Sequence, residues 1–95
     1  QTAFALAFQP RLTTYQQNFS QMASQTNLAR LLAEHGHEEA AERLLTNVVA
    51  QVPHFPHSLW NLAVLYARTG RCEQGRPLAH RARQLDASFA ELVCQ

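Results

Sequence analysis

The sequence predicts an all-α protein made of two stacked helix-turn-helix repeats. Residues 22–55 and 56–89 match one another at an offset of 34, and glycine or proline recurs where the helices of each copy should end. A fixed period of this length is typical of repeat architectures. Against about three matches expected by chance, the copies share the pairs Ser24/Ser58, Asn27/Asn61, Leu28/Leu62, Ala29/Ala63, Leu31/Leu65, Ala33/Ala67, Gly36/Gly70, Glu39/Glu73, Leu44/Leu78 and Phe55/Phe89.

Residues 1–21 precede the repeats. Phe4, Leu6 and Phe8 alternate with alanine, which suits a strand by periodicity and a helix by composition. Nine residues cannot span a bilayer, so this stretch is either an apolar arm packed on a neighbouring surface or the end of a longer membrane helix. Apolar residues from Leu12 onward return at helical spacing, which predicts a helix that packs against or caps the repeats.

Each repeat then follows the same local pattern. Helices are expected over residues 24–35 and 38–49, separated by Gly36, a residue type that favours the left-handed conformation at helix ends. In the second copy, Ser58 is placed to cap a helix that ends at Gly70, and residues 73–85 form its partner. Residues 90–95 would begin a further helix.

The two cysteines, Cys72 and Cys94, would lie near opposite ends of two antiparallel helices in this arrangement. At a rise of 1.5 Å per residue they are separated by about 15 Å, too far for a disulfide. We therefore expect two free thiols. Free thiols favour the cytoplasm over the periplasm, with a membrane tether through the N-terminal region as an alternative.

These residues resemble the tetratricopeptide repeat family, whose unit is a helix-turn-helix of 34 residues. The second copy fits the family pattern better than the first, which has Gln25 in place of a large apolar residue. The resemblance covers residues 22–89 and implies a short right-handed superhelix. The matching positions in the second copy are Leu59, Leu62, Ala63, Tyr66, Gly70, Gly75, Ala79, Ala82 and Ala87.

Family members generally bind peptides or proteins in a concave groove lined by the first helix of each repeat. Equivalent asparagines at Asn27 and Asn61 would meet a peptide backbone, or would simply be solvated. Trp60 would anchor a ligand together with nearby arginines, or would be buried against the preceding helix. Transferred to this chain, the resemblance implies a partner-binding face of Asn27, Arg30, Glu34, His57, Trp60, Asn61, Val64 and Arg68.

No pattern for catalysis, cofactor binding or metal binding is evident. The histidine pairs His35/His37 and His54/His57 fall on turns at opposite ends of helices about 20 Å long, so they cannot form one site. A net charge of +1 gives no general attraction to nucleic acid or to anionic membranes.

The leading hypothesis is a non-enzymatic module, part of a larger protein or assembly, that binds a peptide or protein segment without a cofactor or a metal. The alternative is a structural or oligomerisation role with no peptide ligand. Because two repeats are fewer than such arrays normally need for stability, homodimerisation through an uncapped end is a further expectation.

Overall fold

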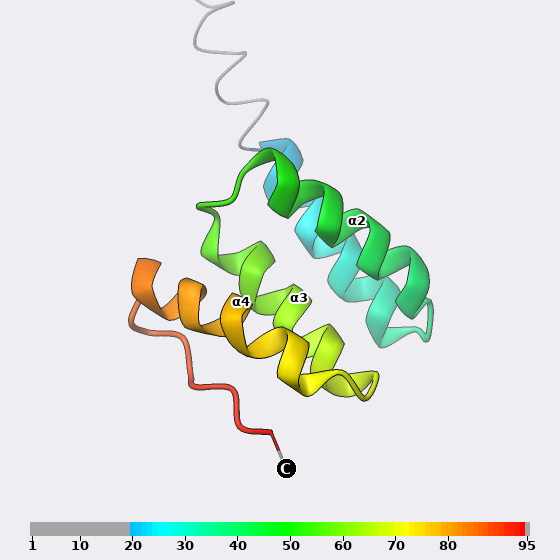
Figure 1. Cartoon of the computed structure of the whole chain (residues 1–95). Coiled ribbons are helices and arrows are strands. Elements are labelled where there is room, and N and C mark those ends of the chain that lie inside the picture. Colours follow the sequence, from blue (N-terminus) through cyan, green and yellow to red (C-terminus); the bar gives the residue numbers. More distant parts are fainter. Residues whose placement is uncertain (1–19, 95) are drawn as a thin grey trace, which may run out of the picture.

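The computed structural model describes residues 20–94, which form four α-helices and no strand. The first helix is described over residues 20–34, and α2 (Glu38–Gln51), α3 (Pro56–Arg68) and α4 (Cys72–Leu85) follow it. The chain reverses direction between consecutive helices, which gives two hairpins (Figure 1). The all-α prediction is confirmed for this part of the chain, whereas the apolar arm and the expected helix before residue 20 lie outside it.

The turn inside each hairpin is built in the same way. Gly36 and Gly70 have φ angles of 88° and 81°, a region that glycine enters without steric cost. The next backbone N–H, of His37 or of Arg71, donates to a carbonyl five residues earlier at 2.8 or 2.7 Å. This closes the helix end, as the sequence predicts.

The expected cap at Ser58 is wrong because α3 begins two residues earlier, at Pro56. Proline suits a first helical position, where its missing N–H costs no hydrogen bond. Ser58 is fully buried, and its hydroxyl donates to the Phe55 carbonyl at 2.9 Å.

One apolar contact joins the two hairpins. Leu62 and Leu65 of α3 are 3% and 2% exposed, and they belong to a buried cluster with residues of the preceding hairpin. We call the latter residues the leucine pocket; its members are Ala29, Ala33, Ala41 and Leu45. Because three of the four are alanines, the helix backbones can approach closely.

Within the second hairpin, α3 and α4 are packed more closely still. A Cβ atom added to Gly75 would lie only 2.7 Å from the carbonyl oxygen of Ala63. Alanine, the usual residue here in the family that the sequence resembles, therefore does not fit this position.

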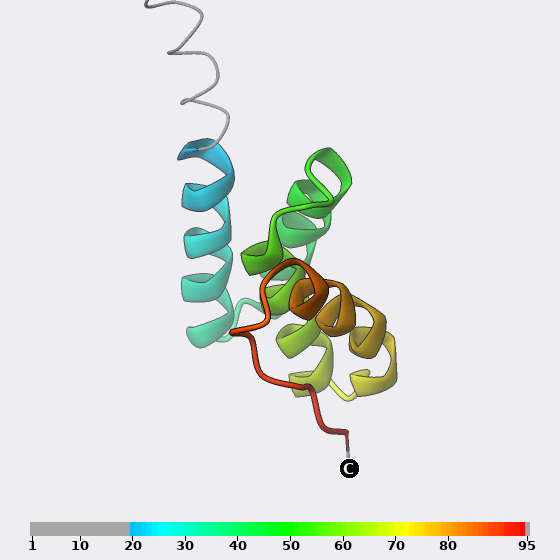
Figure 2. The ribbon, with the colours of Figure 1, turned by 90° about the vertical axis from the view of Figure 1, so that its left-hand side faces the viewer.

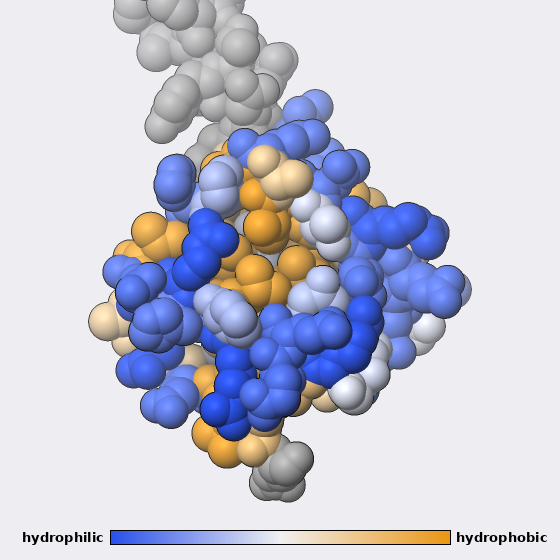
Figure 3. Space-filling view, in the orientation of Figure 1, coloured by the Kyte–Doolittle hydropathy of each residue, from blue (hydrophilic) through white to orange (hydrophobic). Residues whose placement is uncertain are grey.

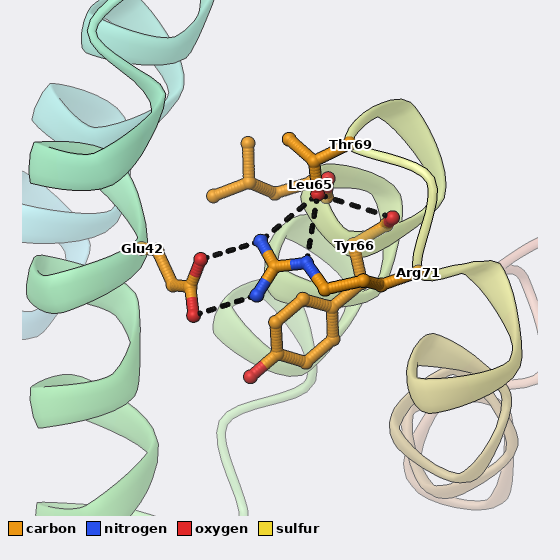
Figure 4. Close-up of polar contacts among 5 residues, drawn as sticks. All are labelled: Glu42, Leu65, Tyr66, Thr69 and Arg71. Atoms are coloured by element: carbon orange, nitrogen blue, oxygen red, sulfur yellow. Dashed lines mark hydrogen bonds and ion pairs between the residues drawn. The ribbon is translucent and has the colours of Figure 1, made fainter.

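A polar network ties α2 to the turn between α3 and α4 (Figure 4). Arg71 donates to both carboxylate oxygens of Glu42, at 2.6 and 3.1 Å, and to the Thr69 hydroxyl at 2.9 Å. Its guanidinium lies 4.7 Å from the centre of the Tyr66 ring. The hydrogen bond from Arg71 lowers the pKa of Glu42, although desolvation acts in the opposite direction.

α2 and α4 are not closely packed, since none of their Cα atoms approach within 8 Å of each other. Figure 3 shows apolar surface in the space between them, surrounded by polar side chains. The partly buried residues packed against the core include Leu44 and Val49 of α2, Tyr66 of α3 and Leu78 of α4. The close backbone packing between the hairpins therefore involves α3, and α4 adds a hydrogen bond from Arg81 to the Pro53 carbonyl at 2.7 Å.

The expected fifth helix is wrong for residues 90–94, which are extended. After α4, the N–H and the hydroxyl of Ser88 both donate to the Asp86 carboxylate, at 3.0 and 2.7 Å, and this turn ends the helix. We call residues 86–94 the strap. It crosses the side of the α3–α4 hairpin that faces away from α2 (Figures 1 and 2).

The strap returns Cys94 to the start of α4, where it forms a disulfide with Cys72 at a Cα–Cα distance of 5.6 Å. The prediction of two free thiols is therefore wrong, because it assumed that residues 90–95 would continue the helical pattern. The correction also removes the reason for favouring a reducing compartment.

Gly75→Ala should destabilise the protein by about 1–3 kcal/mol, because the added methyl group would clash with backbone that cannot rotate away. Helix propensity alone predicts the opposite, a gain of about 1 kcal/mol. Urea unfolding measures the difference. Gln74→Ala, at the exposed neighbouring position, is the matched control, and a Gly75→Ala protein as stable as this control would contradict the packing argument.

Glu42→Gln should lower the free energy of unfolding by about 1 kcal/mol. This is more than the loss expected for a fully exposed ion pair, and it stays small because solvent partly screens the two charges. Because folding lowers the pKa of Glu42, its contribution is complete above the pKa it has in the unfolded chain and disappears as the pH falls through the folded value. The stability of the wild type should thus fall faster than that of the variant below about pH 4.5. Glu34→Gln, which removes the exposed pair with Arg30, is the control; parallel pH curves for all three proteins would contradict the expectation.

Thiol titration of the denatured, unreduced chain should detect no free thiol. Reduction should lower the free energy of unfolding by about 3 kcal/mol for a loop of this length, given a separation of 22 residues. Two titratable thiols before reduction would show that the bond does not form.

Candidate functional site

A groove lies between the first helix and α3, with a volume of about 200 Å³. Its floor is apolar and comes from both hairpins, through Ala29, Ala33, Leu45 and Leu65. Six of the eight residues predicted for a partner-binding face line it together, namely Arg30, Glu34, Trp60, Asn61, Val64 and Arg68. Asn27 and His57 are both exposed and are not among the lining residues.

The rim of the groove carries charges of both signs, and they are largely paired. Arg30 donates to Glu34 one turn further along the first helix, at 3.0 Å. Arg68 reaches from α3 to the carbonyl oxygen of Ala33 at 3.4 Å and lies 4.0 Å from the Glu38 carboxylate. These contacts leave the groove without a strong field of one sign.

The two asparagines occupy different settings although they are equivalent in the repeat. Asn61 donates through Nδ2 to the carbonyl of His57 in its own helix, at 2.6 Å. This bond orients the side chain, so its Oδ1 can accept a hydrogen bond from a ligand in the groove. Asn27 is exposed and is not among the residues that line the groove.

Trp60 occupies the boundary between the groove and the strap. It is partly buried, and its ring centre lies 5.8 Å from that of Phe89. His57 meets the same phenyl ring edge-on at 5.2 Å and lies 5.4 Å from Phe55. Trp60 is therefore partly buried; it lines the groove and also contacts Phe89 of the strap.

Sequence reasoning missed the strap and the aromatic contacts that it makes. The signal that could have revealed it is the Asp86-Ala87-Ser88 segment, a combination that favours a local turn over a helix. Hydrogen bonds from the Ser88 hydroxyl and N–H also lower the pKa of Asp86, with a smaller contribution from His57.

Within residues 20–94, no group of three or more histidine, cysteine or acidic side chains is arranged to hold a metal ion. None of the helices described there is long and apolar enough to cross a membrane. No protein family model and no curated protein matches the chain.

Proposed function

We propose that this chain is a protein-interaction module of the tetratricopeptide type, which binds an extended protein segment in the groove between the first helix and α3. The proposal is for non-catalytic binding as part of a larger protein or assembly.

The observation that carries this proposal is the convergence of six predicted residues on one groove. They come from two helices separated by α2 in the chain, and they surround an apolar floor. A concave site with an apolar base and a few placed polar groups is the usual form of a binding pocket. The 34-residue repeat supports the same reading.

The chemistry of the groove favours a particular kind of segment. Val64 is a partly exposed apolar side chain above the buried Leu45 and Leu65, and Asn61 can accept a hydrogen bond from a backbone N–H. Because Arg30 and Glu34 already neutralise each other, a strongly charged ligand gains little at the rim. We therefore expect a segment of low net charge with an apolar side chain at its centre.

A peptide array probed with the oxidised protein should yield binders of this composition. Asn61→Ala and Trp60→Ala should each weaken the best binder by about tenfold or more, the usual cost of losing a central interface contact. Titration calorimetry measures the change. Asn47→Ala, an exposed asparagine on α2 outside the groove, is the matched control.

The proposal fails if no peptide binds, or if the Asn47 variant loses as much affinity as the Asn61 variant. Circular dichroism of each variant separates a lost contact from a lost fold.

A further inference from the structure

Two leucines on the first helix are exposed to an unusual degree for large apolar residues. Leu28 is 50% exposed and Leu31 is 44% exposed. At the repeat offset of 34 they correspond to Leu62 and Leu65, which are almost fully buried between the hairpins. The first helix thus exposes to solvent the two leucines that are equivalent to the pair that α3 inserts into the leucine pocket.

The leucine pocket also has a counterpart one repeat further along. Its four residues correspond at the same offset to Ala63, Ala67, Gly75 and Ala79 on α3 and α4. All four are small, as a surface that receives leucine side chains requires. We call these four residues the second pocket. Each chain therefore carries the inserting pair at one end and a matching pocket at the other.

The strap borders the second pocket. Val93 and Cys94 line one hollow together with Ala67, and Leu92 lines another together with Ala79. Figure 2 shows the strap crossing this side of the α3–α4 hairpin. Strap residues thus lie beside two of the four second-pocket residues, on the surface that would face a following repeat.

Apart from the disulfide, little holds the last residues of the strap in place. The ion pair between Arg83 and Glu91 measures 3.5 Å, with side chains 44% and 76% exposed, and such pairs contribute little. Val93 is 73% exposed. Phe89 is held by a hydrogen bond from Arg83 to its carbonyl and by the Trp60 and His57 rings, so the bond between the partly buried Cys72 and Cys94 is the main tether of residues 90–94.

We propose that the strap is a disulfide-controlled cap, and that reducing it allows the first helix of a second copy of this chain to pack Leu28 and Leu31 into the second pocket. In this interface, two chains pack against each other in the same way as the two hairpins pack within one chain. This assembly does not depend on the groove or on its ligand.

The switch is a two-electron thiol–disulfide exchange with a dithiol. One thiolate of the dithiol attacks a sulfur of the Cys72–Cys94 bond and forms a mixed disulfide, and the second thiolate then displaces the protein sulfur. The protein gains two electrons and two protons as two thiols, and the dithiol becomes a disulfide.

The two contacting surfaces differ, so the interface is heterologous and leads to open-ended head-to-tail chains unless the rotation between copies closes a ring. The interface between two copies would lack the contact that Glu42 and Arg71 make within one chain. At the repeat offset, Glu42 corresponds to Arg76 of one copy and Arg71 corresponds to His37 of the next copy, and these two residues do not attract one another. Association between copies should therefore be weaker than the packing inside one chain.

Sedimentation velocity over a concentration series tests the proposal, with the complete chain in its oxidised form and after reduction by a dithiol. The oxidised protein should remain a monomer, and the sedimentation coefficient of the reduced protein should rise with concentration. Thiol titration confirms that two thiols have formed per chain, and circular dichroism confirms that the helices persist.

Replacing both exposed leucines, Leu28→Ser and Leu31→Ser, should abolish association of the reduced protein. Leu85→Ser is the matched control, because Leu85 is 47% exposed but lies at the end of α4 outside both surfaces. The double variant Arg76→Glu and His37→Arg places at the junction the charges of the Glu42–Arg71 pair, and it should strengthen association of the reduced form.

A fully reduced, helical protein that stays monomeric at every concentration overturns the proposal. So does association that survives loss of both leucines, because another surface is then responsible. Loss of the helical signal on reduction overturns it as well, since the strap would then maintain the fold instead of covering a docking surface.

Discussion

The fold depends on the insertion of Leu62 and Leu65 into the leucine pocket of the preceding hairpin. A single hairpin leaves one apolar face open, and burying it is the main source of stability in stacked repeats. Small residues in the pocket allow the close approach, and Gly75 does the same between α3 and α4. The contact between Glu42 and Arg71 lies beside this packing and links the hairpins through a directional bond. The groove exists because these contacts hold the first helix and α3 side by side.

Much of this could be predicted from the sequence, because the determinants are local and occur twice. Gly36 and Gly70 mark the turns through their backbone freedom, and the spacing of the apolar residues marks the buried faces. The 34-residue offset places equivalent side chains at equivalent depths in the interior, which is why most of the expected groove residues converge. Asn27 is equivalent to Asn61 in the repeat but does not line the groove, so equivalence in the repeat does not by itself place a side chain there.

The C-terminal segment could not be predicted in this way. Continuing the repeat beyond residue 89 gave a helix, and alanine, glutamate and leucine at residues 90–92 agree with that locally. A turn at Asp86 and Ser88, together with a covalent bond to a residue 22 positions away, overrides this weak preference. Because Cys72 and Cys94 come together only when the segment is extended, the error about the helix and the error about the thiols have one cause.

The lack of close packing between α2 and α4 has a mechanical consequence. Because α2 and α4 have no Cα atoms within 8 Å of each other, a roll of the second hairpin about the axis of α3 breaks no close backbone packing between these two helices. Such a roll would leave α3 in place beside the first helix and would change the distance between α4 and α2. The bond between Glu42 of α2 and Arg71, in the turn between α3 and α4, limits the angle of this roll. The spacing of the two outer helices thus allows their angle to change, and the Glu42–Arg71 bond and the hydrogen bond from Arg81 to the Pro53 carbonyl oppose that change.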